Sequence, residues 1–223
     1  MTSDSTHKVL VLAAHPDDEV LGCGGTIARH THRGDEVRIQ LVADGETSRD
    51  QGAVPEQRQQ AMKDAAALLN VSHAHCLGLM DNQLDAYPLL DLIKKVDTAL
   101  DGYAPDIVYT HSHGDLNIDH RIVYQIAMTL FRPLPGSPVK KILGFEVPSA
   151  TGWMPPETFS PRYFVDITTY YPVKTDALHA YGKELAKAPH IRSFPGVEAL
   201  NRYRGFSMGV EYAEAFDVYR IIE

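Results

Sequence analysis

Hydrophobic and polar residues recur along this chain with two periods, two residues for strands and about 3.6 for helices. Residues 8–14 form an apolar run of the length of a buried strand. Residues 36–43 alternate between apolar and polar side chains, which indicates a strand with one buried face. These patterns predict strands at 8–14, 36–43, 73–77, 107–110, 141–146, 163–166 and 212–220, and helices at 21–33, 55–69, 88–100, 119–131, 172–187 and 197–208.

Predicted strands alternate with predicted helices over most of the chain. The first three elements form a βαβ unit, with a break between helix and strand at Gly34-Asp35. Such alternation is typical of an α/β fold, here a Rossmann-like, mostly parallel sheet with helices on both faces. The chain has 223 residues and shows no internal repeat. We therefore expect a single domain over residues 1–223.

Composition and charge exclude several classes of partner. The formal net charge of -8 argues against nucleic acid or an anionic membrane as the main partner. No apolar run reaches the length of a membrane span, and residues 1–7 lack the apolar region of a signal peptide. Cys23 and Cys76 stand in apolar surroundings, without the spacing of a disulfide framework. A cytoplasmic protein is expected.

Three consecutive acidic residues, preceded by a His-Pro pair, follow the first predicted strand. The segment is His15-Pro16-Asp17-Asp18-Glu19. Acidic residues in a first helical turn often act only as caps. However, the three carboxylates repel one another, and the helix dipole offsets only part of that repulsion. A cation at this carboxyl edge of the sheet would resolve it, and His15 with Asp18 offers a ligand pair that suits Zn²⁺.

A second polar segment, residues 110–121, follows the strand predicted at 107–110 and should open at the same edge. It contains three histidines, two aspartates and one asparagine. A single buried histidine is more often a packed core residue than a ligand. Two loops rich in acids and histidines after two parallel strands instead favour a metal site.

With the segment Ala14–Glu19 and the pair Asp119-His120, the chain resembles the PIG-L, or LmbE-like, family of zinc-dependent N-deacetylases. The resemblance covers nearly the whole chain. It extends to residues 22–25, residues 44–46, Arg58, residues 189–193 and residues 212–216.

The resemblance implies roles for individual residues. It implies that His15, Asp18 and His120 bind the metal and that Asp17 is the general base. Three protein ligands leave an open position for water, whose pKa then falls to about 7, as catalytic zinc requires. Asp119 would orient a catalytic side chain, or would simply cap the helix that starts there.

At one position the chain departs from the family pattern. The family usually has a histidine three residues before the zinc histidine, credited with stabilising the oxyanion or protonating the leaving amine, and here that residue is Asn117. An asparagine can donate a hydrogen bond to an oxyanion but cannot give up a proton at neutral pH. Asp17, His113 and His190 are candidate proton donors, and we expect His190 to serve better than His113.

Other polar residues are candidates for substrate binding. Glu46 and Arg58 could contact sugar hydroxyls, and Arg192 an anionic part of the substrate, with His113 nearby. Each could equally be a solvated surface residue. Trp153, in the proline-rich segment 150–161, could stack on a sugar ring or could anchor its loop.

The predicted function is zinc-dependent removal of an N-acetyl group from an amino sugar or glycoside. The resemblance implies a small-molecule substrate and a homo-oligomer, trimer or hexamer. Two enzymatic alternatives remain, a hydratase of the same family acting on an unsaturated acid and a non-haem iron oxygenase, which tolerates the same ligands. A zinc-stabilised binding protein is a further alternative. A nucleotide-binding Rossmann protein is disfavoured, because acids stand where its fingerprint needs glycines.

Overall fold

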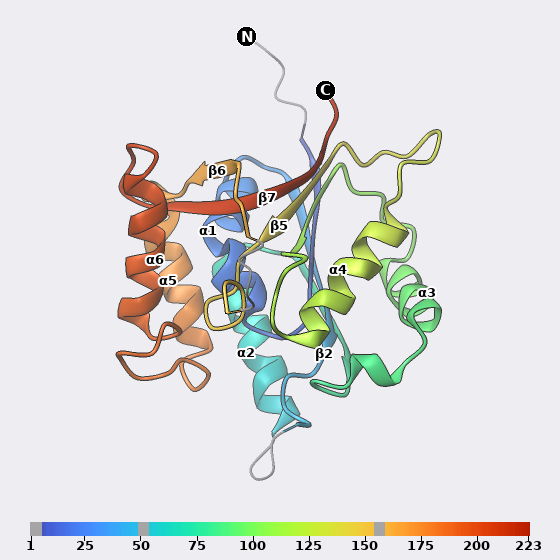
Figure 1. The fold of residues 1–223 in the computed structure, drawn as a ribbon, viewed down its shortest axis with the longest axis horizontal. Helices are drawn as coiled ribbons and strands as arrows, with labels where there is room; N and C mark the ends of the chain where they lie inside the picture. Colours follow the sequence, from blue (N-terminus) through green and yellow to red (C-terminus); the bar gives the residue numbers. More distant parts are fainter. Residues whose placement is uncertain (1–5, 49–53, 154–158) are drawn as a thin grey trace.

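A seven-stranded sheet runs through the middle of the computed structural model, which describes residues 6–48, 54–153 and 159–223 (Figure 1). The strand order is β3-β2-β1-β4-β5-β7-β6. The strands are β1 (Lys8–Ala13), β2 (Glu36–Ala43), β3 (His73–Leu79), β4 (Ile107–His111), β5 (Lys141–Phe145), β6 (Tyr163–Asp166) and β7 (Ala213–Ile221).

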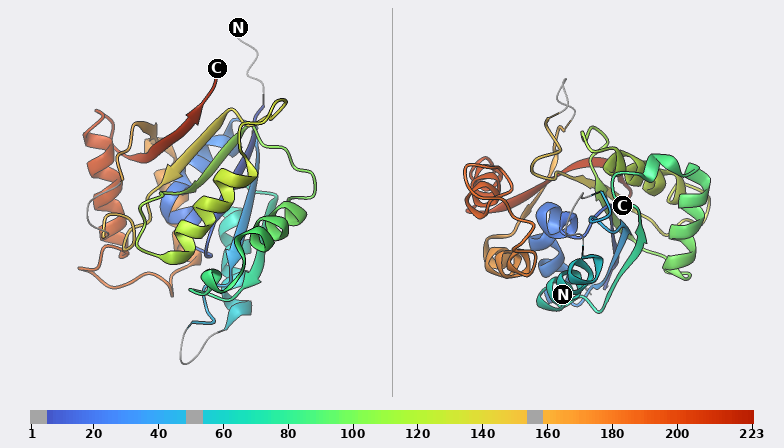
Figure 2. Two further views of the ribbon diagram at one scale, coloured as in Figure 1. Left: turned by 45° about the vertical axis from the view of Figure 1, so that its right-hand side comes forward. Right: turned by 90° about the horizontal axis from the view of Figure 1, so that it is seen from below.

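Helices cover both faces of this sheet (Figures 1 and 2). α3 and α4 pack on one face, and α1, α2, α5 and α6 lie on the other. Within the described residues, none of the helices combines the length and the apolar character that a membrane span needs. The helices are α1 (Asp18–His32), α2 (Pro55–Leu68), α3 (Leu89–Leu100), α4 (Ile118–Leu130), α5 (Tyr171–Ala180) and α6 (Phe194–Phe206), with 3₁₀ turns at Leu84–Ala86 and Thr168–Tyr170.

Strand directions confirm the predicted α/β class. β3, β2, β1, β4 and β5 pair in parallel, whereas β7 pairs antiparallel with β5 and with β6. β1 lies in the interior of the sheet, and its alternate residues enter different cores: Val9 and Val11 pack on the α1 side, Leu10 and Leu12 on the α3–α4 side. Burial on both faces explains the unbroken apolar run in its sequence.

The neighbouring strands β1 and β4 bring the two polar segments together. They pair in parallel with Val9 opposite Ile107 and Val11 opposite Tyr109. The segments that follow them therefore leave the sheet at the same edge, as the sequence predicts for His15. α1 starts at Asp18, three residues earlier than predicted, because Asp18 and Glu19 form its first turn. α4 starts at Ile118, one residue earlier than predicted.

α5 is shorter than the helix predicted at 172–187. It ends at Ala180, and turns lead from there to α6. Gly182, a poor helix former, follows the last turn of α5. Tyr181, at the C-cap, directs its hydroxyl to the buried carboxylate of Glu19, 2.7 Å away. This connection between α5 and α6 consequently reaches the acidic turn.

Glycines allow α1 to lie unusually close to its neighbours. The helix leaves helical geometry at Cys23, where φ is -147° and ψ is 25°. A Cβ atom at Gly22 would overlap the ring of Phe145, and one at Gly25 would lie 2.8 Å from Cβ of Ile167. The glycines at 22–25 thus serve close packing around a break in the helix.

A buried ion pair replaces backbone hydrogen bonds at this break. Lys174 Nζ donates to the carbonyl of Leu21 at 2.9 Å and to Glu214 at 2.6 Å. The Glu214 carboxylate accepts from the backbone N–H groups of Gly25 at 2.9 Å and Thr26 at 2.7 Å. A buried backbone donor or acceptor without a hydrogen-bond partner costs free energy. By pairing with the groups that the break frees, Lys174 and Glu214 stabilise the helix that carries the acidic turn.

We expect Lys174→Met to destabilise the protein by about 3–5 kcal/mol, because it leaves Glu214 as an unpaired buried charge. Urea unfolding followed by circular dichroism measures the change. Lys63→Met is the matched control, since Lys63 is exposed on α2. Equal stability of the two variants would contradict a supporting role for the ion pair.

Candidate metal centre

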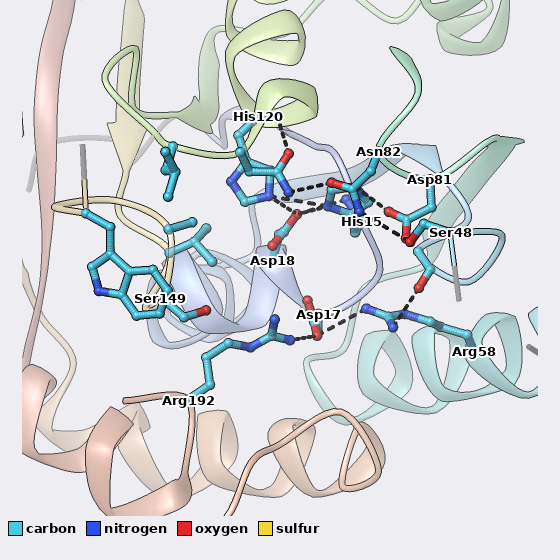
Figure 3. A pocket seen from close by; sticks show the side chains of 16 residues that line it. His15, Asp17, Asp18, Ser48, Arg58, Asp81, Asn82, His120, Ser149 and Arg192 are labelled. Carbon is cyan, nitrogen blue, oxygen red and sulfur yellow. Dashed lines mark hydrogen bonds and ion pairs between the residues drawn. The ribbon is translucent and has the colours of Figure 1, made fainter. Parts of the chain in front are cut away.

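A cavity of about 370 Å³ opens at the carboxyl edge of the sheet (Figure 3). Its walls come from the turn after β1 and from the loops after β2, β3, β4 and β5, together with the connection between α5 and α6. Ligands of α/β proteins usually bind at this edge. The cavity therefore lies where the sequence predicted a site.

Three buried ligand-type atoms form a nearly equilateral triangle in this cavity. Asp18 Oδ2 lies 3.1 Å from His15 Nδ1 and 3.2 Å from His120 Nε2, and the two nitrogens are 3.3 Å apart. A tetrahedral zinc ion with bonds of about 2.0–2.2 Å holds its ligand atoms about 3.3 Å from one another. The donor set and its spacing both fit a zinc ion with one open coordination position.

Carboxylates lie against the other nitrogen of each histidine. His15 Nε2 is 2.9 Å from Asp81 Oδ1 and 3.1 Å from Asp119 Oδ2. His120 Nδ1 is 3.1 Å from Asp115 Oδ2. Metal-binding histidines typically donate their second N–H to such a carboxylate, which fixes the ring and the tautomer. The arrangement leaves His15 Nδ1 and His120 Nε2 as the ligand atoms.

These carboxylates, together with Asp18, favour protonation of the two histidines. Although burial alone would lower it, Asp18 and Asp115 raise the pKa of His120 to about 9. Burial opposes a similar rise at His15, but Asp119 and Asp18 hold its pKa well above the ordinary value. A metal ion must displace these protons, so its affinity for the site should fall as the pH falls.

Asp17 lies beside the triangle of ligand atoms and between two arginines. Its carboxylate is 3.2 Å from Arg58 Nη2 and also pairs with Arg192 Nη2, and the two guanidinium groups approach from opposite sides (Figure 3). Burial raises the pKa of Asp17, and the two arginines oppose that rise. The residue has φ of 112°, a conformation that costs energy for a residue other than glycine and is common at functional sites.

Arg58 uses its donors on the protein itself. It donates to the carbonyls of Pro16 at 2.7 Å and Gly45 at 3.0 Å, and to the carboxylates of Asp17, Glu46 and Glu184. Its Nε also donates to the carbonyl of Pro16, at 3.1 Å. All three nitrogens of the guanidinium group, which carry its five N–H donors, are therefore engaged. This placement favours positioning of the acidic turn over the substrate contact expected from the sequence. Arg192 differs, because its Nε has no hydrogen-bond partner within the part of the chain that the structure describes.

Glu19, the third acid, points away from the cavity. Its carboxylate accepts hydrogen bonds from the hydroxyl of Tyr181 at 2.7 Å and from the backbone N–H of Asp17 at 3.0 Å. Burial raises the pKa of Glu19 to about 8. The turn thus separates its three carboxylates into different surroundings.

Asn117 caps α4 and also lines the cavity. Its Oδ1 accepts from the backbone N–H groups of Asp119 at 2.8 Å and His120 at 3.4 Å, as asparagine does at helix starts. Its Nδ2 donates to Asn82 Oδ1 at 3.0 Å. These contacts leave the second N–H of the Asn117 amide unused.

Four of the expected site residues do not line this cavity. One of them, Asp119, is fully buried behind it and contacts His15. His113 lies outside it with a side chain that is 45% exposed. His190 is exposed and packs edge-on against Trp153, with ring centroids 6.4 Å apart. Glu46 lines a separate cavity behind Arg58. His190 lies in the exposed connection after α5, and His113 lies on a solvent-facing part of the loop after β4. Neither histidine therefore reaches the cavity.

Sequence reasoning missed three residues around the histidines. They are Asp81, which follows β3, Asp115, and His111 at the end of β4. His111 is fully buried, accepts from the N–H of Ala14 at 2.8 Å and stacks on His120 with ring centroids 4.0 Å apart. Asp115 could have been found from its place in the histidine-rich segment, whereas Asp81 carries no comparable signal in the sequence.

Residues 10–131 match the family model described as PIG-L: GlcNAc-PI de-N-acetylase. An uncharacterized deacetylase of Escherichia coli is 30% identical over 176 residues, which cover 76% of this chain and 88% of that protein. The diacetylchitobiose deacetylase of Thermococcus kodakarensis is 28% identical over 220 residues, which cover 93% of this chain and 81% of that protein.

Solved structures share the fold along almost the whole chain. The N,N'-diacetylchitobiose deacetylase of Pyrococcus horikoshii has a TM-score of 0.79 at 23% identity, and the match covers 97% of this chain and 85% of that one. The 4-carboxy-2-hydroxymuconate hydratase of Pseudomonas putida has a TM-score of 0.78 at 19% identity, and the match covers 98% of this chain and 99% of that one. The matched segment 10–131 contains all three atoms of the ligand triangle, and the chain belongs to the PIG-L family.

Proposed function

We propose that this protein is a zinc-dependent deacetylase that hydrolyses the N-acetyl amide of an amino sugar or glycoside. The observation that carries the proposal is the triangle formed by His15, Asp18 and His120, with the Asp17 carboxylate beside it. Membership of the PIG-L family and relatives named as deacetylases of acetylated sugars support the choice of substrate.

The three ligand atoms would hold the metal and leave one position open. When bound, such an ion polarises a carbonyl oxygen and lowers the pKa of water to about 7. Asp115 and Asp119 would keep the two histidine rings in the orientation that presents the required nitrogens. The buried setting would strengthen every charge interaction with the reacting amide.

Asp17 would take a proton from the attacking water as that water adds to the amide carbon. Arg58 and Arg192 hold its carboxylate away from the triangle, which suits a base and not a fourth ligand. The second N–H of Asn117 would donate to the developing oxyanion. Arg192, whose side chain lines the cavity, would contact a hydroxyl or an anionic group of the substrate.

The leaving amine must also receive a proton. Apart from the three ligands, the ionisable side chains that line the cavity within the described residues are Asp17, Arg58, Asp81 and Arg192. Asp81 is engaged with His15, and arginine does not release a proton at neutral pH. We therefore assign both transfers to Asp17, which takes the proton from water and returns it to the nitrogen as the C–N bond breaks. The products are the amine and acetate.

The metal content of purified protein tests the ligand set. We expect about one Zn²⁺ per chain, and its loss in His15→Ala, Asp18→Ala and His120→Ala, measured by elemental analysis after dialysis. Asp115→Asn should retain the ion with an affinity about 10–100-fold weaker. His113→Ala is the matched control, a histidine of the same segment outside the cavity. Full occupancy in all three alanine variants would refute the assignment.

Asp17→Asn separates the base from the ligands. It should keep the metal but lose activity by about 10²–10⁴-fold, the usual contribution of a positioned base. Asp91→Asn, at an exposed position of α3, serves as control. Loss of the metal together with the activity would make Asp17 a ligand instead.

A screen of N-acetylated sugars for released acetate tests the reaction itself. Acetate release that requires the metal and is absent from Asp17→Asn is the expected result. The fold is shared with a hydratase, and a fold does not fix a function. Hydration of an unsaturated acid without any acetate release would favour that alternative, and metal-dependent oxygen uptake would favour the iron oxygenase.

A further inference from the structure

The lining of the cavity is of two kinds. One part is charged and includes the two arginines. The other part, called here the apolar wall, comprises Leu116 from the loop after β4 and Val147, Ala150 and Trp153 from the loop after β5, from which Ser149 also lines the cavity. Val147 and Ala150 are buried, whereas Leu116 is 47% exposed and Trp153 is 53% exposed. The wall therefore extends from the inside of the cavity to its mouth, where it presents two large apolar side chains to solvent.

Hydrogen bonds fix the two loops that form the apolar wall. The backbone N–H groups of Leu116 and Trp153 both donate to the carbonyl of Ala150, at 3.4 Å and 3.3 Å. The hydroxyl of Thr151 donates to Asp115 Oδ2 at 2.7 Å, and that carboxylate also contacts a candidate metal ligand. A surface that is already ordered loses little conformational freedom when a ligand binds.

A second ring supports the indole of Trp153. The ring of His190 lies against it at an interplanar angle of 72°. The Nδ1 atom of His190 accepts the backbone N–H of Arg192 at 3.1 Å, and the Arg192 side chain contacts Asp17. His190 thus connects Trp153, at the mouth of the cavity, with Arg192 and the acidic turn. This is a structural contact, and it differs from the role of proton donor expected from the sequence.

We propose that the apolar wall is a subsite for a second sugar ring, so that the substrate is an N-acetylated oligosaccharide and Trp153 is its stacking platform. This inference rests on the proposed function, with the reacting sugar inside the cavity. The cavity, about 370 Å³, is at the small end of the range of roughly 300–1,000 Å³ for ligand sites. A longer substrate must therefore pass over the mouth.

The chemistry of the mouth favours a sugar ring over a lipid chain. A pyranose has an apolar C–H face, which an indole can cover, and hydroxyls at its edge that remain in contact with water or polar groups. Leu116 and Trp153 offer such a face, and the charged side chain of Arg192 lines the same cavity. An alkyl chain would instead need an apolar groove on both sides.

Trp153 is the only tryptophan in the chain, so its fluorescence reports directly on the apolar wall. We would titrate zinc-loaded Asp17→Asn protein, in which turnover during the titration should be small, with N-acetylglucosamine and with N,N'-diacetylchitobiose. The disaccharide should shift the emission and bind about tenfold more tightly, the contribution of one good aromatic contact. Calorimetric binding of the disaccharide without any change in emission would overturn the proposal.

Kinetics on the wild-type background give a second readout. Trp153→Ala should raise KM for the disaccharide about tenfold, with kcat nearly unchanged and with no effect on the monosaccharide, whereas Trp153→Phe should retain most of the affinity. Tyr203→Ala is the control, since Tyr203 is 64% exposed on α6, away from the cavity. Equal KM values of Trp153→Ala and wild type for the disaccharide would refute the subsite.

The outcomes for the subsite and for the proposed function are distinguishable. If acetate is released equally well from both sugars and Trp153→Ala is silent, the subsite is wrong and the deacetylase stands. If no sugar releases acetate, the proposed function is wrong, whatever the fluorescence shows. Tighter binding of an octyl glycoside of N-acetylglucosamine than of the disaccharide would overturn the choice of a sugar ring.

Discussion

Mutual repulsion among three consecutive carboxylates is the constraint on which the rest of this structure depends. Asp17, Asp18 and Glu19 cannot share one environment at a helix start, and the fold gives each a different partner. Asp17 faces two arginines, Asp18 two histidines, and Glu19 the hydroxyl of Tyr181. Apart from His15, which belongs to the turn itself, these partners come from α2, α4 and the connection between α5 and α6, so distant parts of the chain converge on one turn.

The acidic turn is strained, and its support is accordingly extensive. Asp17 adopts a positive φ, and α1 breaks only a few residues later at Cys23. Arg58 holds the carbonyl of Pro16 before the strained residue, while Lys174 and Glu214 satisfy the backbone groups at the break. Strain of this kind persists only where the surroundings over-determine it, and it is concentrated at sites that position reacting groups.

Much of the fold and part of the site could be predicted because they depend on local patterns. The apolar run of β1 and the parallel pairing rule place His15 and His120 at one edge, as the structure has them. Roles set by the direction of a loop could not be predicted: Asp81 carries no sequence signal, and His190 faces Trp153 because α5 ends early. The sequence offered Asp119 as a possible cap of this helix, but Asn117, directly before α4, takes that position.

Anomalous diffraction at the zinc edge from crystals of the zinc-loaded protein tests the central claim most directly. Three overlapping groups of buried side chains could hold an ion here, and Asp18 is a member of one of them only. The account predicts one peak within bonding distance of His15 Nδ1, Asp18 Oδ2 and His120 Nε2, with a fourth ligand that is not a protein atom. A peak between His111 and Asp115, or a fourth bond from Asp17, would contradict it.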